Sequence, residues 1–537
     1  MGSGLYQVDF TKADRPRTWK YSARYYIDIV KQNGFPAGED ELPLYGHFRD
    51  DMMWSTATIE GAWRADGKGL SIWDTFAHTP LRVSNDDTGD VACDSYHKPD
   101  EDVRMLQNLG VGFYRFSISW SRVLPDGTTA HVNEPGLRYY EYLVDALLSS
   151  NSTLPQITLF HWDLPQALQD VGGWENDTIV ERFTQYADLM FSRLGHKVKH
   201  WITINEPYIF TNIGHGYGAA APGISFRPGT LPYIVGHNLL KAHAEAWHLY
   251  NSTYRPSQKG IISITLNSDW AAAQPSQARG LRRLLSQFQL GWFAHPIFVG
   301  DYSELMKTTI RNRSLAGGLP KSRLPEFTPE QIQRINGTHD FFGFNHYTTK
   351  LAFPLSYGNL QGTGTVVDRA WLDSGSGWLK VTPFGFRRIL KFIKENYGNP
   401  PIIVTENGVS QRQMDLNDTL RQHYYTEYIN QALKAYLLDG VDIRGYTAWS
   451  LMDNLEWATG FAEQFGLYFV NRSDPKLTRT PKVSVQTFST IIRCNGFPDP
   501  KSGHECLKPQ PEATRRCTLS RLLRLEPELH KNNRRSV

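Results

Sequence analysis

Two glutamates are the first candidates for chemistry in this chain of 537 residues. Glu206 closes the run "KHWITINE" (199–206), and Glu406 stands near the end of "PIIVTEN" (401–407). Both runs are short and rich in β-branched residues, so each predicts a strand that ends at a carboxylate. Two carboxyl groups facing one cavity can cleave a glycosidic bond, because one protonates the leaving oxygen while the other stabilises the oxocarbenium-like centre. For either Glu alone, an ion pair with an arginine explains the residue equally well.

The two runs belong to a series of eight short apolar runs that alternate with longer, helix-like segments. This alternation is typical of βα units on a parallel sheet, and eight units predict one (β/α)8 TIM barrel. The active site of such a barrel lies at the carboxyl ends of its strands. The runs are 52–58, 111–118, 155–162, 199–206, 260–267, 340–347, 401–407 and 444–451. Other polar side chains lie at or near the ends of these runs: Arg115, His161, Trp162, Asn205, Asn345, His346, Tyr347 and Asn407.

Composition narrows the class of ligand. A net charge of +3 is too small to indicate nucleic-acid binding. The 15 Trp and 26 Tyr are numerous, and aromatic rings with a polar edge suit stacking on the CH face of a sugar. His131, His215 and His237 have no partner at a ligand spacing, so we expect no metal site and no cofactor. The sequence therefore favours a small glycoside as the partner.

The cysteines and the Asn-x-Ser/Thr triplets bear on the compartment. Cys494 and Cys506 could form a disulfide or remain two free thiols. Seven triplets indicate a secreted, lumenal or cell-surface glycoprotein. Residues 1–20 hold no apolar signal core and no stretch is long enough to span a membrane, so membrane association is not evident. Either the protein is cytosolic or its true N-terminus is missing. The triplets begin at Asn151, Asn176, Asn251, Asn312, Asn336, Asn417 and Asn471.

The beginning of the chain repeats its end. Residues 4–36 and 466–498 align without a gap and agree at 13 of 33 positions, including the whole of Asn33–Pro36 and Asn495–Pro498. This repeat favours the second explanation, in which the chain has been cut from a longer array.

Several motifs in order resemble the family 1 glycoside hydrolases, the β-glucosidase and β-galactosidase family. They are "YRFSISWSRVLPDG" (114–127), "LFHWDLPQAL" (159–168), "TINEP" (203–207), "FFGFNHYTT" (341–349), "IIVTENG" (402–408) and "WSLMDNLEWATGF" (449–461). The resemblance implies a retaining exo-β-glycosidase that hydrolyses terminal β-D-glucosides or β-D-galactosides through a covalent glycosyl-enzyme.

The resemblance also implies a role for individual residues. Glu206 matches the general acid/base and Glu406 the nucleophile, while Arg115 and Tyr347 match the residues that hydrogen-bond the nucleophile. Asn205 matches the residue that binds the sugar 2-hydroxyl. The sugar pocket is implied to contain His161, Trp162, Trp449, Glu456 and Trp457, and Trp378 matches the platform for the aglycone.

The resemblance gives the domain boundaries as well. Family domains end in a segment like 466–498, so we interpret residues 1–36 as the loosely packed or disordered remnant of a preceding homologous repeat and 37–47 as a linker. Residues 48–498 form the barrel and 499–537 a basic, disordered tail. The chain therefore most resembles one repeat of a tandem family member of the lactase-phlorizin hydrolase or klotho type.

One departure from the family pattern affects the sugar pocket. The first strand reads "FRDDMMWSTATIEGAW" (48–63), and it fits the family pattern only if four residues after Thr58 are absent, among them a sugar-binding Gln. The alternative interpretation is therefore a catalytically weak, klotho-like repeat that binds a sugar or a protein. Such non-enzymatic relatives typically lack one of the two carboxylates, whereas this chain keeps both.

Overall fold

The structure is a computed structural model that describes residues 6–9, 11–19, 42–59, 67–150, 153–272, 278–354 and 363–508. The chain divides into two compact units, Met1–Leu44 and Tyr45–Val537. In the first unit, β1 (Tyr6–Val8) and β2 (Arg17–Trp19) form an antiparallel hairpin in which Tyr6 faces Trp19. This part of the expected loose remnant is therefore folded into a hairpin.

The second unit is built on eight parallel strands that close into a barrel in the order β10-β15-β16-β4-β5-β6-β7-β8. Each of the eight runs expected from the sequence matches one of these strands, with β6 and β16 beginning one residue earlier, and the predicted TIM barrel is confirmed. The barrel strands are β4 (Met53–Thr58), β5 (Phe113–Ser117), β6 (Leu154–Phe160), β7 (His200–Asn205), β8 (Ile261–Asn267), β10 (Phe342–Asn345), β15 (Ile402–Asn407) and β16 (Ile443–Trp449).

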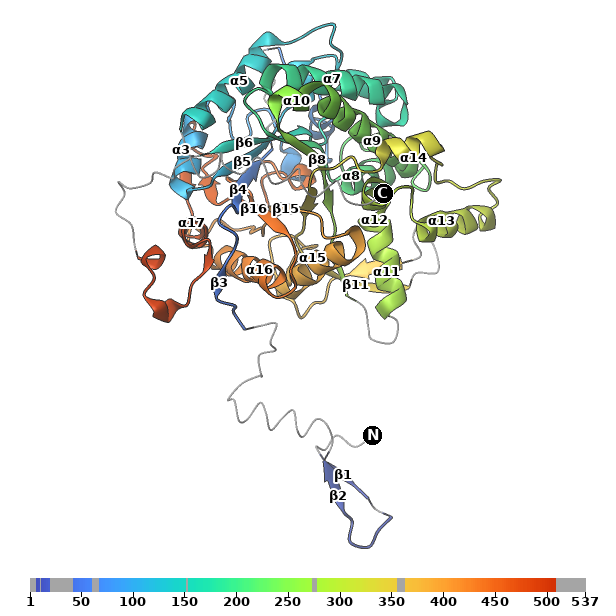
Figure 1. Cartoon of the computed structure of the whole chain (residues 1–537), viewed down its shortest axis with the longest axis vertical. Coiled ribbons are helices and arrows are strands. Elements are labelled where there is room, and N and C mark those ends of the chain that lie inside the picture. Colours follow the sequence, from blue (N-terminus) through green and yellow to red (C-terminus); the bar gives the residue numbers. More distant parts are fainter. Residues whose placement is uncertain are drawn as a thin grey trace. The chain divides into compact units, whose positions relative to one another are not determined.

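Helices form a ring outside the strands (Figure 1). The longer helices are α3 (Pro99–Leu109), α5 (Glu134–Ser149), α7 (Thr178–Leu194), α9 (Leu231–Leu249), α11 (Ala278–Gln289), α12 (Gly291–Phe298), α13 (Glu304–Ala316), α15 (Pro383–Tyr397), α16 (Thr419–Leu437) and α17 (Ser484–Cys494). The shorter ones are α2 (Ile72–Ala77), α4 (Trp120–Val123), α6 (Gln166–Asp170), α8 (Pro207–Ile209), α10 (Arg255–Gln258) and α14 (Pro329–Ile335).

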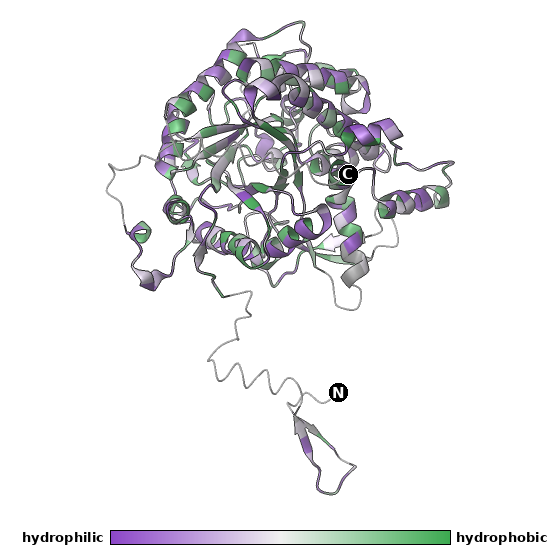
Figure 2. Ribbon diagram, in the orientation of Figure 1, coloured by the Kyte–Doolittle hydropathy of each residue, from purple (hydrophilic) through white to green (hydrophobic). Residues whose placement is uncertain are grey.

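The outer helices carry apolar residues on the side that faces the barrel. In α7 the buried residues recur every three or four positions, at Ile179, Phe183, Ala187 and Phe191, as an amphipathic helix requires. In Figure 2 the outer helices accordingly alternate between hydrophobic and hydrophilic colours along their length. The barrel strands are buried almost throughout, because helices cover one side and side chains fill the other.

Short strands outside the barrel form small sheets. These strands are β3 (Gly46–His47), β9 (Trp270–Ala272), β11 (Thr349–Pro354), β12 (Thr363–Val366), β13 (Leu372–Asp373), β14 (Lys380–Val381), β17 (Tyr468–Val470), β18 (Arg479–Pro481) and β19 (Gly496–Phe497). The hairpin of β17 and β18 pairs Tyr468 with Pro481, the same register as Tyr6 with Trp19 in the first unit. The sequence repeat is thus also a repeat of local structure.

The two ends of the second unit differ from the expected boundaries. β3, placed in the expected linker 37–47, pairs with β19, so the second unit begins at Tyr45 rather than at 48. At the other end, a disulfide joins Cys494 to Cys506. Residues 499–508, expected to be part of a disordered tail, contain two short 3-10 helices, whereas 509–537 lie outside the described residues.

Candidate active site

Both glutamates face one cavity at the carboxyl ends of the barrel strands. The cavity has a volume of about 520 Å³. Its walls include most of the site residues expected from the sequence: His161, Trp162, Asn205, Glu206, Tyr347, Trp378, Glu406, Trp449, Glu456 and Trp457. Arg115 does not line the cavity. It is only 1% exposed, and it donates hydrogen bonds to two lining residues, Glu406 and Asn205.

Glu406, on β15, is held by two donors, one on each carboxylate oxygen. Arg115 Nη1 donates to Oε1 at 2.7 Å, and the Tyr347 hydroxyl donates to Oε2 at 2.7 Å. The side chain is 5% exposed, so the guanidinium balances a charge that would otherwise be costly to bury. Both contacts fix the direction of the carboxylate.

Glu206 follows β7 and has the opposite electrostatic environment. Burial and then the charge of Glu406 raise its pKa to about 8, while Asn345 Nδ2, which donates to Oε1 at 2.7 Å, opposes the rise. A group with this pKa remains protonated at neutral pH and can donate a proton to a leaving oxygen. The two carboxyl groups therefore have environments that suit different tasks.

Asn205 contacts Arg115 and Asn345, the residues that hydrogen-bond the two carboxyl groups, and also His161. Its Oδ1 accepts from Arg115 Nη2 at 2.7 Å and from Asn345 Nδ2 at 3.2 Å, and its Nδ2 lies 3.0 Å from His161 Nε2. Burial and then Arg115 hold the pKa of His161 well below its usual value, so the neutral ring accepts at Nε2. Its Nδ1 then carries the proton, which leaves a donor for a ligand.

Aromatic side chains and Glu456 form another wall. Trp457 lies 4.4 Å from Trp162 and 5.6 Å from His161, measured between ring centroids. Burial and then the charge of Glu406 raise the pKa of Glu456 well above its usual value, and its Oε2 has no hydrogen-bond partner among the described residues. An unsatisfied buried carboxyl is unfavourable, so this wall is prepared for a polar ligand.

Three site residues adopt backbone conformations that non-glycine residues seldom take. The φ angles are 77° for Trp162, 43° for Glu206 and 53° for Trp457. Each costs about 1–3 kcal/mol and persists only where the surrounding structure imposes it. Their concentration around one cavity is typical of a functional site.

Trp378 marks the mouth of the cavity. The residue is 45% exposed, and its ring lies 5.7 Å from that of Tyr347 in an edge-to-face arrangement. Lys350 Nζ lies 5.6 Å from the Trp378 ring centroid. A flat ligand entering from solvent would meet this ring first.

The end of the first barrel strand supplies no hydrogen bond to this cavity. The Thr58 hydroxyl is instead 2.5 Å from that of Tyr114, and Thr58 does not line the cavity. Gln464 does not line this cavity either, and its backbone pairs with that of Gln411. Residues 60–66 lie outside the described part of the chain.

Two functional contacts were not predicted from the sequence. Asn345 was recognised only as one of the polar residues that end strands, yet it donates to both Asn205 and Glu206. Glu463 also lines the cavity and accepts from Arg412 Nη2 at 2.9 Å. The available signal for Asn345 was its place at the end of a predicted strand within the motif 341–349. Glu463 lies in a loop with no such signal.

The described residues also bear on metal and membrane binding. They contain no group of three or more His, Cys, Asp or Glu side chains that could hold a metal ion. Among them, no helix combines the length and the hydropathy needed to cross a bilayer.

A family model decides the classification. The model for glycosyl hydrolase family 1 matches residues 44–497. The chain belongs to glycosyl hydrolase family 1. It is 63% identical to human lactase/phlorizin hydrolase over 95% of its own length, but it spans only 27% of that relative.

Solved family 1 structures resemble the chain closely. An aphid myrosinase is 38% identical, covers 83% of this chain and 99% of its own, and has a TM-score of 0.80. A rice β-glucosidase mutant in a covalent complex with Glc is 37% identical, covers 82% and 98%, and has a TM-score of 0.77. Family 1 members are O-glycosyl hydrolases, and the chain shares both their fold and their sequence pattern.

Proposed function

We propose that the chain is a retaining exo-β-glycosidase that releases a terminal β-D-glucose or β-D-galactose from a small glycoside. The observation that carries the proposal is the contrast between the two carboxyl groups. Glu406 is paired with Arg115 and Tyr347, while the pKa of Glu206 is raised to about 8. A nucleophile must be ionised and a general acid must be protonated, and these environments support that division.

The reaction takes two displacements. A Glu406 oxygen attacks the anomeric carbon, the bond to the aglycone oxygen breaks, and the Glu206 proton passes to that oxygen. A water molecule then attacks the same carbon, gives a proton to the Glu206 carboxylate and releases Glu406. Two inversions retain the β configuration. Asn205 and the neutral His161, which the Arg115 network orients, supply hydrogen bonds to the sugar.

The remaining cavity residues divide between the two parts of the substrate. Glu456 and Trp457, with Trp162 and Trp449 beside them, suit the polar edge and apolar face of the sugar. The partly exposed Trp378 suits a flat aglycone. The 63% identity to lactase/phlorizin hydrolase supports glucosides and galactosides as the substrate class.

We also propose that the chain is one repeat of a tandem protein. The residues common to 4–36 and 466–498 include those that attach the second stretch to its barrel. Tyr468 donates to Met105 O at 3.2 Å and Lys482 donates to Asp453 Oδ1 at 2.8 Å. The corresponding residues of the first stretch are again a Tyr and a Lys, Tyr6 and Lys20. A preceding barrel would use them in the same way, which supports reading 1–36 as its end.

The surface supports an extracellular, lumenal or cell-surface location. Six of the seven predicted glycosylation triplets fall on described residues, and none of their asparagines is buried. Glycan attachment requires such accessibility. Asn151 lies outside the described residues.

The proposal is tested by trapping the covalent intermediate. The protein is incubated with an activated 2-fluoro-β-glucoside or its galactoside counterpart, and its intact mass is measured, with Glu406→Gln as the control. We expect one sugar adduct per molecule on the unchanged protein alone. No adduct on a folded protein would contradict the proposal and favour the klotho-like binding repeat, for which the short first strand is the supporting observation.

A further inference from the structure

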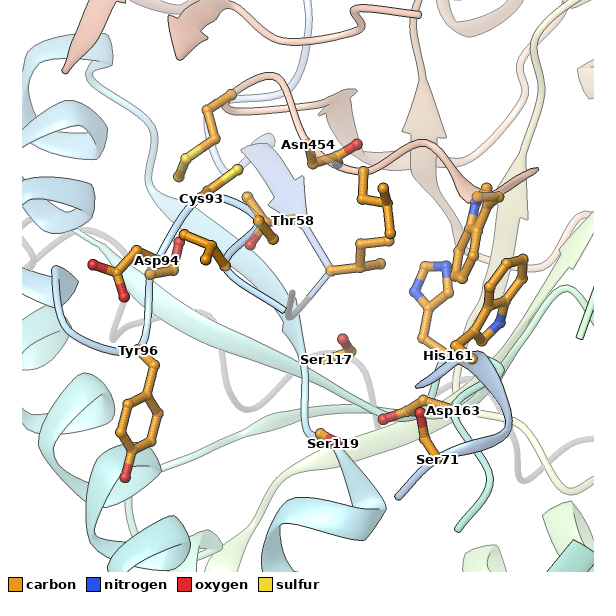
Figure 3. Close-up of a pocket in the computed structure, with 18 of the residues that line it drawn as sticks. Thr58, Ser71, Cys93, Asp94, Tyr96, Ser117, Ser119, His161, Asp163 and Asn454 are labelled. Atoms are coloured by element: carbon orange, nitrogen blue, oxygen red, sulfur yellow. The ribbon is translucent and has the colours of Figure 1, made fainter. Parts of the chain in front are cut away.

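The loop that joins β16 to β17, residues 450–467, forms part of the wall of the active-site cavity. Glu456 and Trp457 lie on it and line that cavity. Asn454, slightly earlier on the loop, lines a second cavity of about 70 Å³, and Figure 3 shows it on one side of this cavity with His161 on the other. Trp457 lines both cavities. A cavity offers no packing atoms, so the position of this part of the loop depends strongly on how its two ends are held.

The two ends of the loop meet at Asp453 and Gly466, which we call the loop stem. Asp453 N donates to Tyr468 O at 3.0 Å, and Gly466 N donates to Asp453 Oδ1 at 2.9 Å. A Cβ atom on Gly466 would lie 2.1 Å from Asp453 N, so a larger residue there would force the backbone to shift. The two ends are therefore close enough for a single side chain to bridge them.

The Lys482 ammonium makes this bridge. It donates to Asp453 Oδ1 at 2.8 Å and to Gly466 O at 2.9 Å, and the side chains of Lys482 and Asp453 are 1% and 9% exposed. Asp453 Oδ2 has no hydrogen-bond partner among the described residues. Loss of the ammonium would thus leave a buried carboxylate without its cation, which is costly, and we expect the loop stem to open in response.

The loop has a second attachment farther along. Phe461 N donates to Asp87 Oδ2 at 2.9 Å, and the Arg472 guanidinium carbon lies 3.3 Å from the centroid of the Phe461 ring. Glu456 and Trp457 lie between this attachment and the loop stem. If the stem opened, the segment that carries them would be held at one side only.

We propose that Lys482 is a positioning residue for sugar recognition. Its ammonium closes the loop stem and so holds Glu456 where its carboxyl, whose Oε2 has no hydrogen-bond partner among the described residues, meets a sugar hydroxyl. Lys482 does not line the active-site cavity, so it acts through Glu456. The role of Glu456 in sugar binding rests on the proposed glycosidase function, whereas the closed stem does not.

The test measures binding without requiring turnover. Phenyl 1-thio-β-D-glucoside and its 3-, 4- and 6-deoxy analogues, in which sulfur replaces the glycosidic oxygen, are titrated into the unchanged protein by calorimetry. At least one deoxy analogue should bind about ten-fold more weakly than the glucoside, because the Glu456 carboxyl loses its hydroxyl partner. If every deoxy analogue binds as well as the glucoside, or if nothing binds, the proposal is wrong.

The decisive variant replaces both members of the buried pair. Lys482→Met combined with Asp453→Asn leaves no unpaired buried charge, so we expect it to fold. In this double variant the deoxy difference should fall to within about two-fold, because the carboxyl no longer meets the hydroxyl. A deoxy difference that stays ten-fold would overturn the proposal.

A second ion pair provides the matched control. Arg255 Nη1 lies 2.7 Å from Asp340 Oδ2, and the same oxygen accepts from Ile262 N near the start of β8, at the end of the barrel opposite the active site. Arg255→Met combined with Asp340→Asn should lower the stability but keep the deoxy difference. Loss of the difference in this control as well would assign the effect to general destabilisation and reject the positioning role.

A double-mutant cycle with Glu456→Ala gives a readout that a merely structural role would not change. Glu456→Ala should abolish the deoxy difference by itself. Combined with the replacements at Lys482 and Asp453, it should weaken glucoside binding by much less than the product of the two separate factors, because the stem acts through this carboxyl. Multiplicative losses would contradict the proposal.

Hydrolysis of phenyl β-D-glucoside separates the two proposals. Turnover by the unchanged protein, together with an unchanged deoxy difference in the double variant at Lys482 and Asp453, would reject the positioning role alone. A deoxy difference that this double variant loses, in a protein that hydrolyses no glycoside, would reject the glycosidase and retain the positioning role.

Discussion

At the scale of single residues, the proposed mechanism depends on the protonation of Glu206 in the first displacement. Its pKa of about 8 arises from burial and from the charge of Glu406, and Asn345 holds it below the value that these two causes would give. In the proposed mechanism Glu206 is the general acid, so its protonated form is the active one. Activity is therefore retained below this pKa and lost as pH rises through it.

The first prediction concerns this alkaline limit. In the pH profile of kcat/KM, we expect the rate to fall with an apparent pKa near 8. Asn345→Ala removes the donor to the ionised carboxylate and should move the limit to higher pH. Glu406→Gln removes the neighbouring charge and should move the pKa of Glu206 lower, as followed by carbon-13 NMR of labelled glutamate. Shifts in the opposite directions would contradict the roles assigned to Asn345 and Glu406.

The second prediction concerns proton donation by Glu206. Glu206→Ala should reduce kcat by about 10²–10⁴ for glycosides with a poor leaving group and much less for activated aryl glycosides, which need no proton. Azide, a small anion that needs no general base, should restore turnover and give the β-glycosyl azide. The measurement is product analysis by NMR; the α-azide would contradict a retaining double displacement.

At the scale of elements, the end of β4 is the place where this chain departs from its family pattern. The Thr58 hydroxyl contacts Tyr114 instead of the active-site cavity, and the second cavity opens beside it. From the resemblance to the family pattern, we expect the missing amide to remove hydrogen bonds to sugar hydroxyls that are costly to leave unpaired.

The third prediction restores that segment. Insertion of four residues ending in Tyr-Gln between Thr58 and Ile59 should raise kcat/KM for β-glucosides by about 10²–10³, because the amide gains two hydroxyl contacts in the transition state. The control insertion ends in Tyr-Ala and should not raise the rate. Equal rates for the two insertions would show that the amide is not the missing element.

The fourth prediction concerns the end of α17. The disulfide between Cys494 and Cys506 closes a loop with a sequence separation of 12. Replacement of Cys506 by Ala should lower the free energy of unfolding by about 3 kcal/mol, the loop-closure value for this length. Urea unfolding measures the change, and addition of reductant to the unchanged protein is the control. A loss below about 0.5 kcal/mol would indicate that unfolding does not release this loop.

At the scale of the whole molecule, the barrel brings together residues that are far apart in the sequence. Arg115, Asn205 and Glu406 come from β5, β7 and β15, yet one guanidinium contacts the other two side chains at 2.7 Å each. Of the predicted glycosylation triplets on described residues, four have exposed asparagines and two, at Asn176 and Asn471, have partly exposed ones. Most candidate site residues are therefore buried at the barrel, while the predicted glycosylation triplets lie at the surface.

The fifth prediction tests that surface. Expression through the secretory pathway of mammalian cells should give a protein whose mass falls by several glycans on digestion with peptide N-glycosidase F. The same chain made in bacteria should show no change. Conversion of Asn251 to Gln removes one exposed triplet and should reduce the glycan mass by one unit. An unglycosylated secreted product would contradict the proposed location.

The sequence by itself determined the eight barrel strands, the pair Glu206 and Glu406, and the repeat at the two ends. Strand periodicity and strand-terminal motifs are local signals, so they can be recognised without knowledge of the fold. Only the tertiary structure showed that Asn345 donates a hydrogen bond to Glu206 and that Glu463 lines the active-site cavity. It also showed that the Thr58 hydroxyl contacts that of Tyr114. It also decided that Cys494 pairs with Cys506 and that a second cavity adjoins His161. Apart from the disulfide, which is local to the end of α17, these features depend on distances between strands and loops that are far apart in the sequence, and the closed barrel sets those distances.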